Sequence, residues 1–355
     1  MELHTFWFIL IAVLWIGYLV LEGFDFGVGM LLPVLGRTDT ERRVLINTIG
    51  PVWDGNEVWL LVAGGATFAA FPEWYATLFS GFYLPLLLIL VALIIRGVAF
   101  EYRGKIDDPA WRARWDLAII VGSFLPSLLW GVAFANIVRG VPINADKQFT
   151  GTLFTLLNPF GLLGGVVTLL LFALHGAVFL ALKTSGDVRE RAGALAARLA
   201  LPATVAAAVW AVWLQLAYSD NGWTWAAVAV AAVALLGAIQ ATRLRKEGLA
   251  FLLTSLVLVS AVVLIFGALF PNVMPSTTDP AFSLTVSNAS STDYTLKVMS
   301  WVAVILTPFV LLYQSWTYWV FRRRIGVGDI PAFAGLPKLV TPSGGLVPTQ
   351  GDAKE

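Results

Sequence analysis

The 355-residue sequence contains no cysteine, and histidine, methionine and charged residues are all scarce. Without cysteine the chain cannot form disulfides, thiolate nucleophiles, iron–sulfur clusters or sulfur-ligated zinc sites. Its soft metal ligands are limited to His4, His175 and four methionines. A membrane enzyme that binds several haems needs several axial His or Met ligands. We therefore expect this chain alone to bind neither haem nor a metal ion.

Charged residues make up only 13% of the chain, whereas hydrophobic residues make up 58%. Soluble domains usually devote about a quarter of their residues to Asp, Glu, Lys and Arg, so water cannot be the main solvent of this chain. The formal net charge of +1 gives no reason to expect nucleic-acid binding. The composition predicts a polytopic membrane protein surrounded by membrane lipid.

Nine apolar stretches are each long enough for the roughly 20 residues of a membrane-spanning helix. They are Phe6–Leu32, Val52–Phe71, Tyr75–Phe100, Leu117–Val138, Thr155–Leu182, Leu199–Tyr218, Trp223–Thr242, Leu249–Phe270 and Leu296–Phe321. Helices are expected because a lipid-exposed segment must satisfy its own backbone hydrogen bonds. The predicted fold class is an all-α bundle of nine transmembrane helices. Residues 1–321 are expected to form one transmembrane domain, and residues 322–355, rich in Pro and Gly, a poorly ordered cytoplasmic tail.

Lys and Arg residues are concentrated in alternate loops and in the C-terminal tail. Of the 23, only Arg139 and Lys147 lie in the intervening loops, and Arg96 and Lys297 lie in or beside predicted spans. The positive-inside rule therefore predicts an external N-terminus and a cytoplasmic C-terminus, which agrees with an odd number of spans. The first stretch has no positive charge before it, so we expect it to remain as a helix rather than to be cleaved as a signal peptide.

Ionisable residues in the predicted spans gather near the predicted cytoplasmic surface. They are Glu22, Asp25, Asp54, Glu57, Arg96 and Glu101. Such residues are costly in a membrane, and close carboxylates raise one another's proton affinity. We therefore predict that this group takes up protons from the cytoplasm. The alternative interpretation is that Arg96 neutralises one acid and the group only fixes the packing of three helices.

His175 lies in the middle of the fifth apolar stretch, where no second metal ligand accompanies it. A lone histidine in such a position is typical of hydrogen-bonded packing rather than of metal binding. We therefore interpret His175 as a structural residue.

Seven segments carry distinctive runs of glycine, aromatic and polar residues. They are Leu21–Met30 (LEGFDFGVGM), Asp39–Arg43 (DTERR), Trp53–Trp59 (WDGNEVW), Ala63–Ala66 (AGGA), Ser80–Tyr83 (SGFY), Leu157–Leu163 (LNPFGLL) and Phe270–Ser276 (FPNVMPS). Together, and in this order, they resemble subunit II of cytochrome bd quinol oxidase. The resemblance extends from the first to the ninth apolar stretch, and that family's arrangement of nine helices fits the spans predicted above.

The resemblance implies a complex in the bacterial plasma membrane that oxidises quinol and reduces dioxygen to water. It implies that haem b and haem d belong to cytochrome bd subunit I, which this chain supports, and it allows for a small single-helix subunit. Asp54 matches a motif acid linked to proton uptake, and Glu101 occupies a position where relatives have Asp. Trp59 matches an aromatic residue associated with an apolar oxygen route.

Two other interpretations remain open at this point. The acidic group would also suit a proton- or cation-coupled transporter, although its position at one surface rather than at the midplane is unlike such proteins. Alternatively, the chain is a structural scaffold that holds subunit I and takes no part in proton or oxygen delivery.

Overall fold

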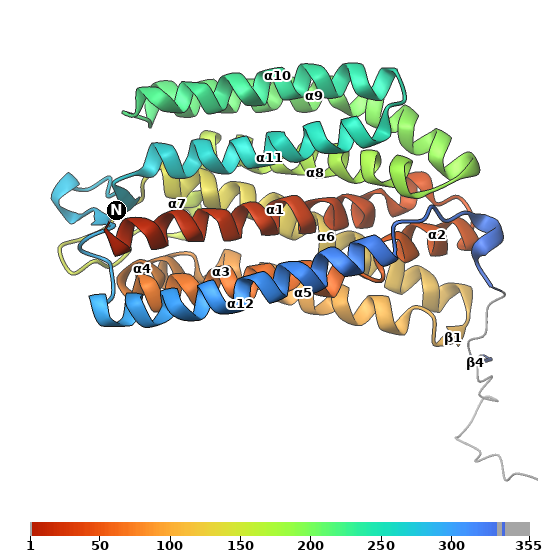
Figure 1. Ribbon diagram of the computed structural model, residues 1–355, viewed down its shortest axis with the longest axis horizontal. Coiled ribbons are helices and arrows are strands. Elements are labelled where there is room, and N and C mark those ends of the chain that lie inside the picture. Colours follow the sequence, from red (N-terminus) through yellow and green to blue (C-terminus); the bar gives the residue numbers. More distant parts are fainter. Residues whose placement is uncertain (1, 332–335, 338–355) are drawn as a thin grey trace, which may run out of the picture.

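The computed structural model describes residues 2–331 and 336–337, which form a bundle of long helices running in alternating directions (Figure 1). The helices are α1 (Leu3–Leu35), α2 (Asp39–Ile49), α3 (Trp53–Ala70), α4 (Pro72–Gly81), α5 (Tyr83–Tyr102), α6 (Pro109–Arg139), α7 (Leu153–Leu156), α8 (Pro159–Lys183), α9 (Gly186–Ala217), α10 (Trp225–Arg243), α11 (Glu247–Leu269) and α12 (Asp293–Val320). The short strands β1 (Ile106–Asp107) and β4 (Leu336–Pro337) pair in parallel, and β2 (Asn272–Met274) and β3 (Leu284–Thr285) pair antiparallel.

Eight helices in the described part of the chain are long and apolar enough to cross a membrane. The predicted second span corresponds to α3, which is not among the eight. Its first two turns carry Asp54, Asn56 and Glu57, and these polar residues lower the apolarity of an 18-residue helix. The structure therefore shows a polytopic helical membrane protein, in agreement with the predicted class.

The predicted third span, Tyr75–Phe100, is wrong as a single helix. The structure divides this region into α4 and α5, which meet at Phe82. A continuous helix would need an N–H at position 85 to bond the carbonyl of Gly81, and Pro85 has none. The break is also packed, because a Cβ at Gly81 would lie 2.7 Å from the Phe149 side chain.

The other predicted spans appear as helices whose ends differ from the sequence estimate. Helices α6 and α9 begin well before the predicted starts, because their first turns are polar and carry no hydropathy signal. Helix α8 begins at Pro159 rather than at Thr155. Its start is fixed by Asn158, whose side chain accepts a hydrogen bond from the Gly161 N–H, and by a proline in the first position.

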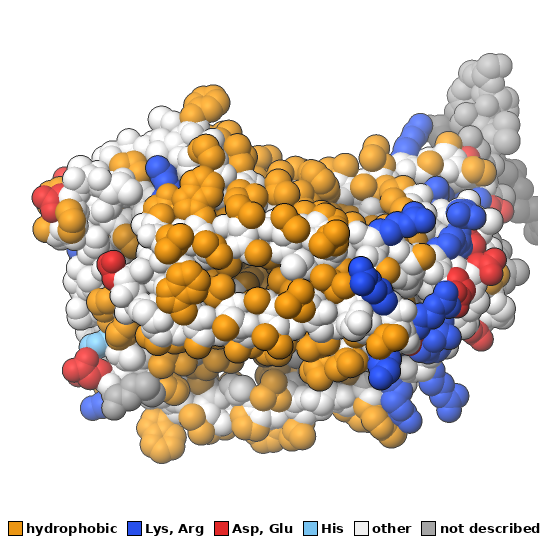
Figure 2. Space-filling view, turned by 90° about the horizontal axis from the view of Figure 1, so that it is seen from above, with side chains coloured by type: hydrophobic (Ala, Val, Ile, Leu, Met, Phe, Trp, Pro, Cys, Tyr) orange, Lys and Arg blue, Asp and Glu red, His pale blue; other side chains and the backbone are white. Residues whose placement is uncertain are grey.

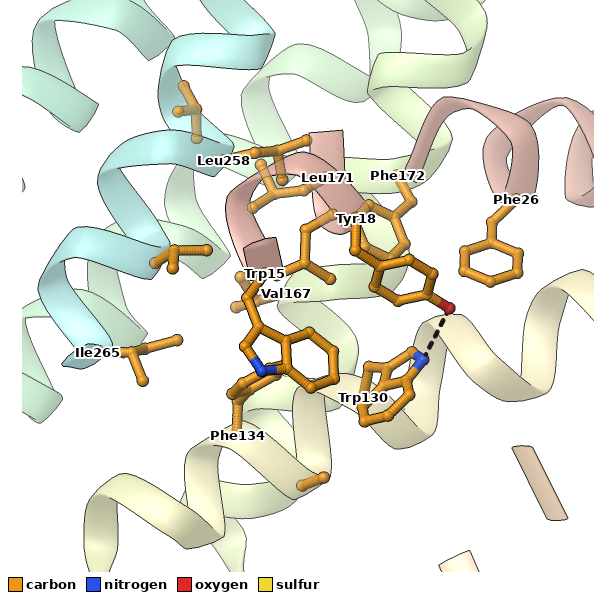
Figure 3. Close-up of a cluster of buried hydrophobic side chains, with 14 of the residues drawn as sticks. Trp15, Tyr18, Phe26, Trp130, Phe134, Val167, Leu171, Phe172, Leu258 and Ile265 are labelled. Atoms are coloured by element: carbon orange, nitrogen blue, oxygen red, sulfur yellow. Dashed lines mark hydrogen bonds between the residues drawn. The ribbon is translucent and has the colours of Figure 1, made fainter. Parts of the chain in front are cut away.

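Helix α1 lies at the centre of the bundle and contacts α3, α6, α8 and α11. Its glycines permit close approach to α8, since a Cβ at Gly27 would lie 2.1 Å from the Phe172 carbonyl oxygen. An aromatic cluster fills the space between α1 and α6 (Figure 3). There, Trp15 packs edge-on against Trp130 at 4.9 Å, and Trp130 donates a hydrogen bond to Tyr18. The core is thus built around the first helix.

The surface divides into an apolar band and two polar ends (Figure 2). Lys and Arg side chains gather mainly at the end from which the C-terminal tail emerges. The first part of that tail is ordered, because Ile325 pairs with Thr184 between α8 and α9. Lys183 also donates hydrogen bonds to the carbonyls of Phe321 and Arg323. Most of the predicted poorly ordered tail, residues 332–335 and 338–355, lies outside the described residues.

Candidate functional site

A buried ion pair between α1 and α5 is the centre of the candidate site. Arg96 donates a hydrogen bond to Glu22, and neither side chain is exposed. The rings of Phe26 and Phe100 lie 4.8 and 5.2 Å from the guanidinium carbon. Removing one member of a buried pair leaves an uncompensated charge and typically costs about 3–5 kcal/mol. The pair therefore ties α5 to α1, whatever else it does.

A chain of hydrogen bonds connects the second buried acid, Asp25, to helix α12. The Asn56 amide donates to Asp25 at 2.7 Å, and its own oxygen accepts from the Tyr318 hydroxyl at 2.7 Å. Gln314 donates to the same Asn56 oxygen at 3.4 Å and accepts from the Trp59 indole at 3.0 Å. In each of these bonds the residue farther from Asp25 is the donor and the nearer one is the acceptor. The network therefore fixes one carboxylate oxygen of Asp25 as an acceptor.

Several polar atoms in this region have no hydrogen-bond partner among the described residues. They are Oδ1 of Asp25, Oε2 of Glu22, and Nε and one terminal nitrogen of Arg96. Buried polar groups without partners are costly, and polar sites of this kind usually hold ordered water in folded proteins. The arrangement can therefore bind water and relay protons between carboxylates.

The structure brings together only part of the predicted acidic group. Asp25 and Arg96 are fully buried beside Glu22, and Glu57 is half-buried on α3. Asp54 and Glu101 are exposed on the surface of this chain, at the ends of α3 and α5. The group thus extends from surface carboxylates to buried ones.

Sequence reasoning missed Asn56, Gln314 and Tyr318, which connect Asp25 and Trp59 to α12. The available signal was weak, because an amide or a phenol in an apolar span carries no charge. Asn56 and Gln314 are nevertheless the polar residues that a span would be expected to bury only with partners. Gln314 is also one of only two buried residues of α12, with Leu296.

A second polar cluster ties helix α2 and the α5–α6 loop to the same end of the bundle. Arg103 is buried and bonds Asp116 at 2.5 Å and Asp39 at 2.8 Å. Arg42 bonds the other oxygen of Asp116 at 2.8 Å. The acids lower the free energy of the charged guanidinium more than burial raises it, so the pKa of Arg103 is raised. This cluster was not predicted, since its members lie between the predicted spans, in segments expected to be loops, where charges are ordinary.

Glu41 anchors helix α2 through a capping box and an ion pair. Its carboxylate accepts from the backbone N–H of Arg37 and Thr38, and it pairs with Arg191 on α9. Burial by itself would raise the pKa of Glu41. The Arg191 side chain and the two backbone donors outweigh burial, and the pKa is lowered.

His175 is a packing residue, as predicted. One ring nitrogen lies 2.7 Å from the Thr254 hydroxyl and the other 3.1 Å from the Val20 carbonyl oxygen. The ring is fully buried and stacks on Phe251 at a centroid distance of 4.7 Å. Both nitrogens are therefore occupied, and the environment does not fit an axial haem ligand.

The comparison with known families identifies the family to which this fold belongs. The model of the cytochrome bd terminal oxidase subunit II family matches residues 3–321. The chain belongs to this family. It is a subunit of a cytochrome bd oxidase and passes several times through the bacterial plasma membrane. Because the chain belongs to an oxidase family, the transporter interpretation of the acidic group is set aside.

Individual relatives agree with the family assignment. The chain is 47% identical over 331 residues to cytochrome bd ubiquinol oxidase subunit 2 of Bacillus subtilis (strain 168), covering 91% of this chain and 97% of that protein. It is 42% identical over 367 residues to cytochrome bd-I ubiquinol oxidase subunit 2 of Escherichia coli (strain K12), covering 92% and 96%. A solved bd oxidase chain from Geobacillus thermodenitrificans superimposes with a TM-score of 0.73 at 18% identity, covering 91% of this chain and 98% of that one. At that identity, the similarity concerns the fold.

Proposed function

We propose that this chain is the haem-free subunit of a quinol:oxygen oxidoreductase and supports a haem-bearing subunit I. The observation that carries the proposal is the family match across residues 3–321. Two observations support the haem-free assignment. Both ring nitrogens of His175 have hydrogen-bond partners, and His4 lies 2.8 Å from the Glu2 carboxylate at the N-terminus. Haem b, haem d and the quinol-oxidising site then belong to the partner, and bound haem supplies the oxygen chemistry there.

The face formed by α12, α3 and α5 is the surface that we assign to the partner. Helix α12 is the least buried of the eight candidate spans, with 6% of its most apolar window buried. Its exposed side chains include Trp301, Phe309 and Trp316, at 71%, 66% and 65% exposure. A helix that packs so little against its own chain, yet carries large aromatic groups, suits contact with another subunit.

The acidic group is proposed as part of the cytoplasmic proton route of the complex. Asp54 and Glu101 lie at the surface, Glu57 is half-buried, and Asp25 is buried with one free oxygen. A membrane interior passes protons only through titratable groups or ordered water. These residues supply the groups, with Arg96 compensating part of the negative charge.

The membrane orientation belongs to the same proposal. We infer that α3 crosses the membrane in addition to the eight helices named above, which gives nine spans. We also infer that the N-terminus is external and that the basic end in Figure 2 is cytoplasmic. In that orientation Asp54 and Glu101 face the compartment that supplies protons. The scaffold function remains the second candidate, because the buried ion pair of Glu22 and Arg96 alone would account for charged residues inside a packed bundle.

Trp59 is proposed to form part of an apolar oxygen route. It lies five residues beyond Asp54, about 7 Å further along the axis of α3. Its indole packs directly on α1, because a Cβ at Gly17 would lie 2.1 Å from the ring. Held by Gln314 on the other side, Trp59 forms a fixed wall rather than a mobile side chain.

Spectroscopy of the isolated chain and of the complex tests the central proposal. The purified chain should show no stoichiometric Soret band, because its two histidines lie far apart in the sequence and both have partners. The complex with subunit I should be coloured. A reproducible Soret band in the isolated chain would overturn the haem-free assignment. Purification without any haem-bearing partner would overturn the oxidase function.

A further inference from the structure

Tyr18 on α1 carries a buried hydroxyl that the proton route described above does not use. Its side chain has no exposed area, and its oxygen accepts a hydrogen bond from the Trp130 indole at 3.1 Å (Figure 3). The hydroxyl's own hydrogen has no acceptor among the described residues. A buried donor without an acceptor is costly, so the position of this hydroxyl calls for an explanation.

The carboxylate of Glu22 offers the acceptor that Tyr18 lacks. Tyr18 and Glu22 are four residues apart, so their side chains lie one above the other on the same face of α1. Arg96 occupies Oε1 of Glu22, while Oε2 has no hydrogen-bond partner among the described residues. Glu22 is also close enough to act electrostatically on the Tyr18 hydroxyl. A donor without an acceptor and an acceptor without a donor therefore lie one turn apart.

Tyr18 lies further from the basic end of the molecule than Glu22 does. The N-terminus of α1 lies at the end opposite the tail (Figure 1), so Tyr18 is about 6 Å further along the axis, at about 1.5 Å per residue. Between Tyr18 and His4 the helix carries no ionisable side chain. Trp130 lines an apolar groove beside α3 and α5, on the face that we assign to subunit I. Through Trp130, Tyr18 connects the acidic group to the wall of that face.

We propose that Tyr18 exchanges a proton with Oε2 of Glu22 and extends the proton route inward, towards subunit I. A hydroxyl oxygen has two lone pairs, and its hydrogen rotates to suit its surroundings. Trp130 occupies one lone pair. The other accepts a proton from protonated Glu22, and the hydroxyl hydrogen leaves to an acceptor oxygen on the side of subunit I. One proton moves, and the phenol stays neutral.

Trp130 does not continue this chain, because an indole N–H is a donor only. The assignment of Tyr18 rests on the proton route proposed above, and it adds to that route the step that follows the buried acids.

Two variants that break the same hydrogen bond separate the proton role from a packing role. Tyr18→Phe removes the hydroxyl and keeps the ring, whereas Trp130→Phe removes the donor and leaves the hydroxyl in place. Turnover of the purified complex with subunit I, normalised to haem, is measured in light and in heavy water. Tyr218→Phe is the control, because this half-buried tyrosine at the end of α9 lies outside the acidic group.

Tyr18→Phe should slow turnover per haem by about tenfold or more, the effect of losing a positioned proton-transfer group. The ratio of the rates in light and heavy water should rise, because proton transfer then limits turnover. Trp130→Phe and Tyr218→Phe should remain close to the wild type. Equal slowing in Tyr18→Phe and Trp130→Phe would assign the hydrogen bond a packing role and overturn the proposal. Wild-type turnover in Tyr18→Phe, or its failure to assemble, would also count against it.

Asp54→Asn, measured in parallel, separates a failure of this assignment from a failure of the proton route. Slow turnover in Asp54→Asn with wild-type turnover in Tyr18→Phe would remove Tyr18 alone. Wild-type turnover in both variants would remove the route itself.

Discussion

At the scale of single residues, Asp54 and Asp25 differ in burial, although the sequence analysis placed both in one acidic group. Asp25 is buried and held by Asn56, whereas Asp54 is exposed at the start of α3. An exposed carboxylate contributes little to packing, so its function can be tested without breaking the fold. The buried pair of Glu22 and Arg96 cannot be separated from stability in this way.

Asp54→Asn should slow turnover per haem by roughly tenfold or more, as expected when a positioned proton-transfer group is lost. The amide keeps the shape and the hydrogen-bonding capacity but cannot exchange a proton with water. Assembly with subunit I and haem content should stay normal. Quinol oxidase turnover, normalised to haem, measures the effect.

The control for this variant is Asp220→Asn, which alters an exposed carboxylate in the loop between α9 and α10. Wild-type turnover per haem in Asp54→Asn would contradict the proton role. Loss of haem with normal turnover in the remaining complex would favour the scaffold function instead.

Trp59→Ala should raise the oxygen concentration needed for half-maximal turnover and leave the apparent affinity for quinol unchanged. The substitution removes the wall between Gly17 and Gln314 and admits lipid or water into a dry path. Oxygen-consumption curves at saturating quinol provide the measurement. Trp225→Phe, an exposed tryptophan on α10, serves as the control. Unchanged oxygen dependence in a fully assembled variant would remove Trp59 from the oxygen route.

At the scale of elements, helix α2 depends on ion pairs that the hydrophobic pattern cannot show. Its capping box with Thr38 is readable in the sequence, but the Arg191 partner of Glu41 comes from α9. The clusters around Glu41 and Arg103 hold α2 and the α5–α6 loop against the bundle. These contacts hold α2 and the α5–α6 loop in place at the end of the molecule where Asp54 and Glu101 are exposed.

Lowering the pH should loosen α2 through Glu41. The folded pKa of Glu41 is below its unfolded value of about 4.3, so its stabilising contribution is complete above the unfolded pKa and is lost as the pH falls through the folded one. Glu41→Gln should cost about 1 kcal/mol at pH 7 and should flatten the acid-side dependence. Hydrogen exchange of α2 amides between pH 7 and pH 3 measures both. An identical pH dependence in wild type and variant would contradict the assignment.

At the scale of the whole molecule, the exposed face of α12 makes the isolated chain an incomplete structure. Several large aromatic side chains lie on it. On its other side α12 is held by hydrogen bonds that Trp59 donates to Gln314, Tyr318 donates to Asn56 and Trp7 donates to the Leu296 carbonyl. In the membrane this face can contact either lipid or protein. The proposed contact with subunit I predicts that a charge is tolerated worse here than on a face that remains in lipid.

Phe309→Arg should reduce the ratio of haem subunit to this chain in purified material severalfold. An unpaired charge cannot be buried between two subunits without a large cost. Leu236→Arg, at an equally exposed position on α10, should lower the yield of both subunits without changing their ratio, because an arginine facing lipid can reach the membrane surface. An unchanged ratio in Phe309→Arg would place the partner on another face.

The sequence by itself determined the membrane class, the helical fold, the asymmetry of basic residues and the acids worth considering. These properties follow from local composition: apolar runs of sufficient length, charges at loop positions, and carboxylates that a membrane does not tolerate without reason. The motifs in Leu21–Met30 and Trp53–Trp59 were enough to indicate the family, which the comparison then confirmed.

Only the tertiary structure decided which of those acids meet. Glu22 and Arg96 are 74 positions apart, and Trp59 and Gln314 are 255 apart, so no periodicity could pair them. The division of the third predicted span at Phe82, the exposed position of Asp54 and the hydrogen bond between Tyr18 and Trp130 likewise depend on how separate helices pack. Hydropathy reports the preference of each segment for lipid, whereas contacts between helices depend on side-chain shape and hydrogen bonding across the bundle.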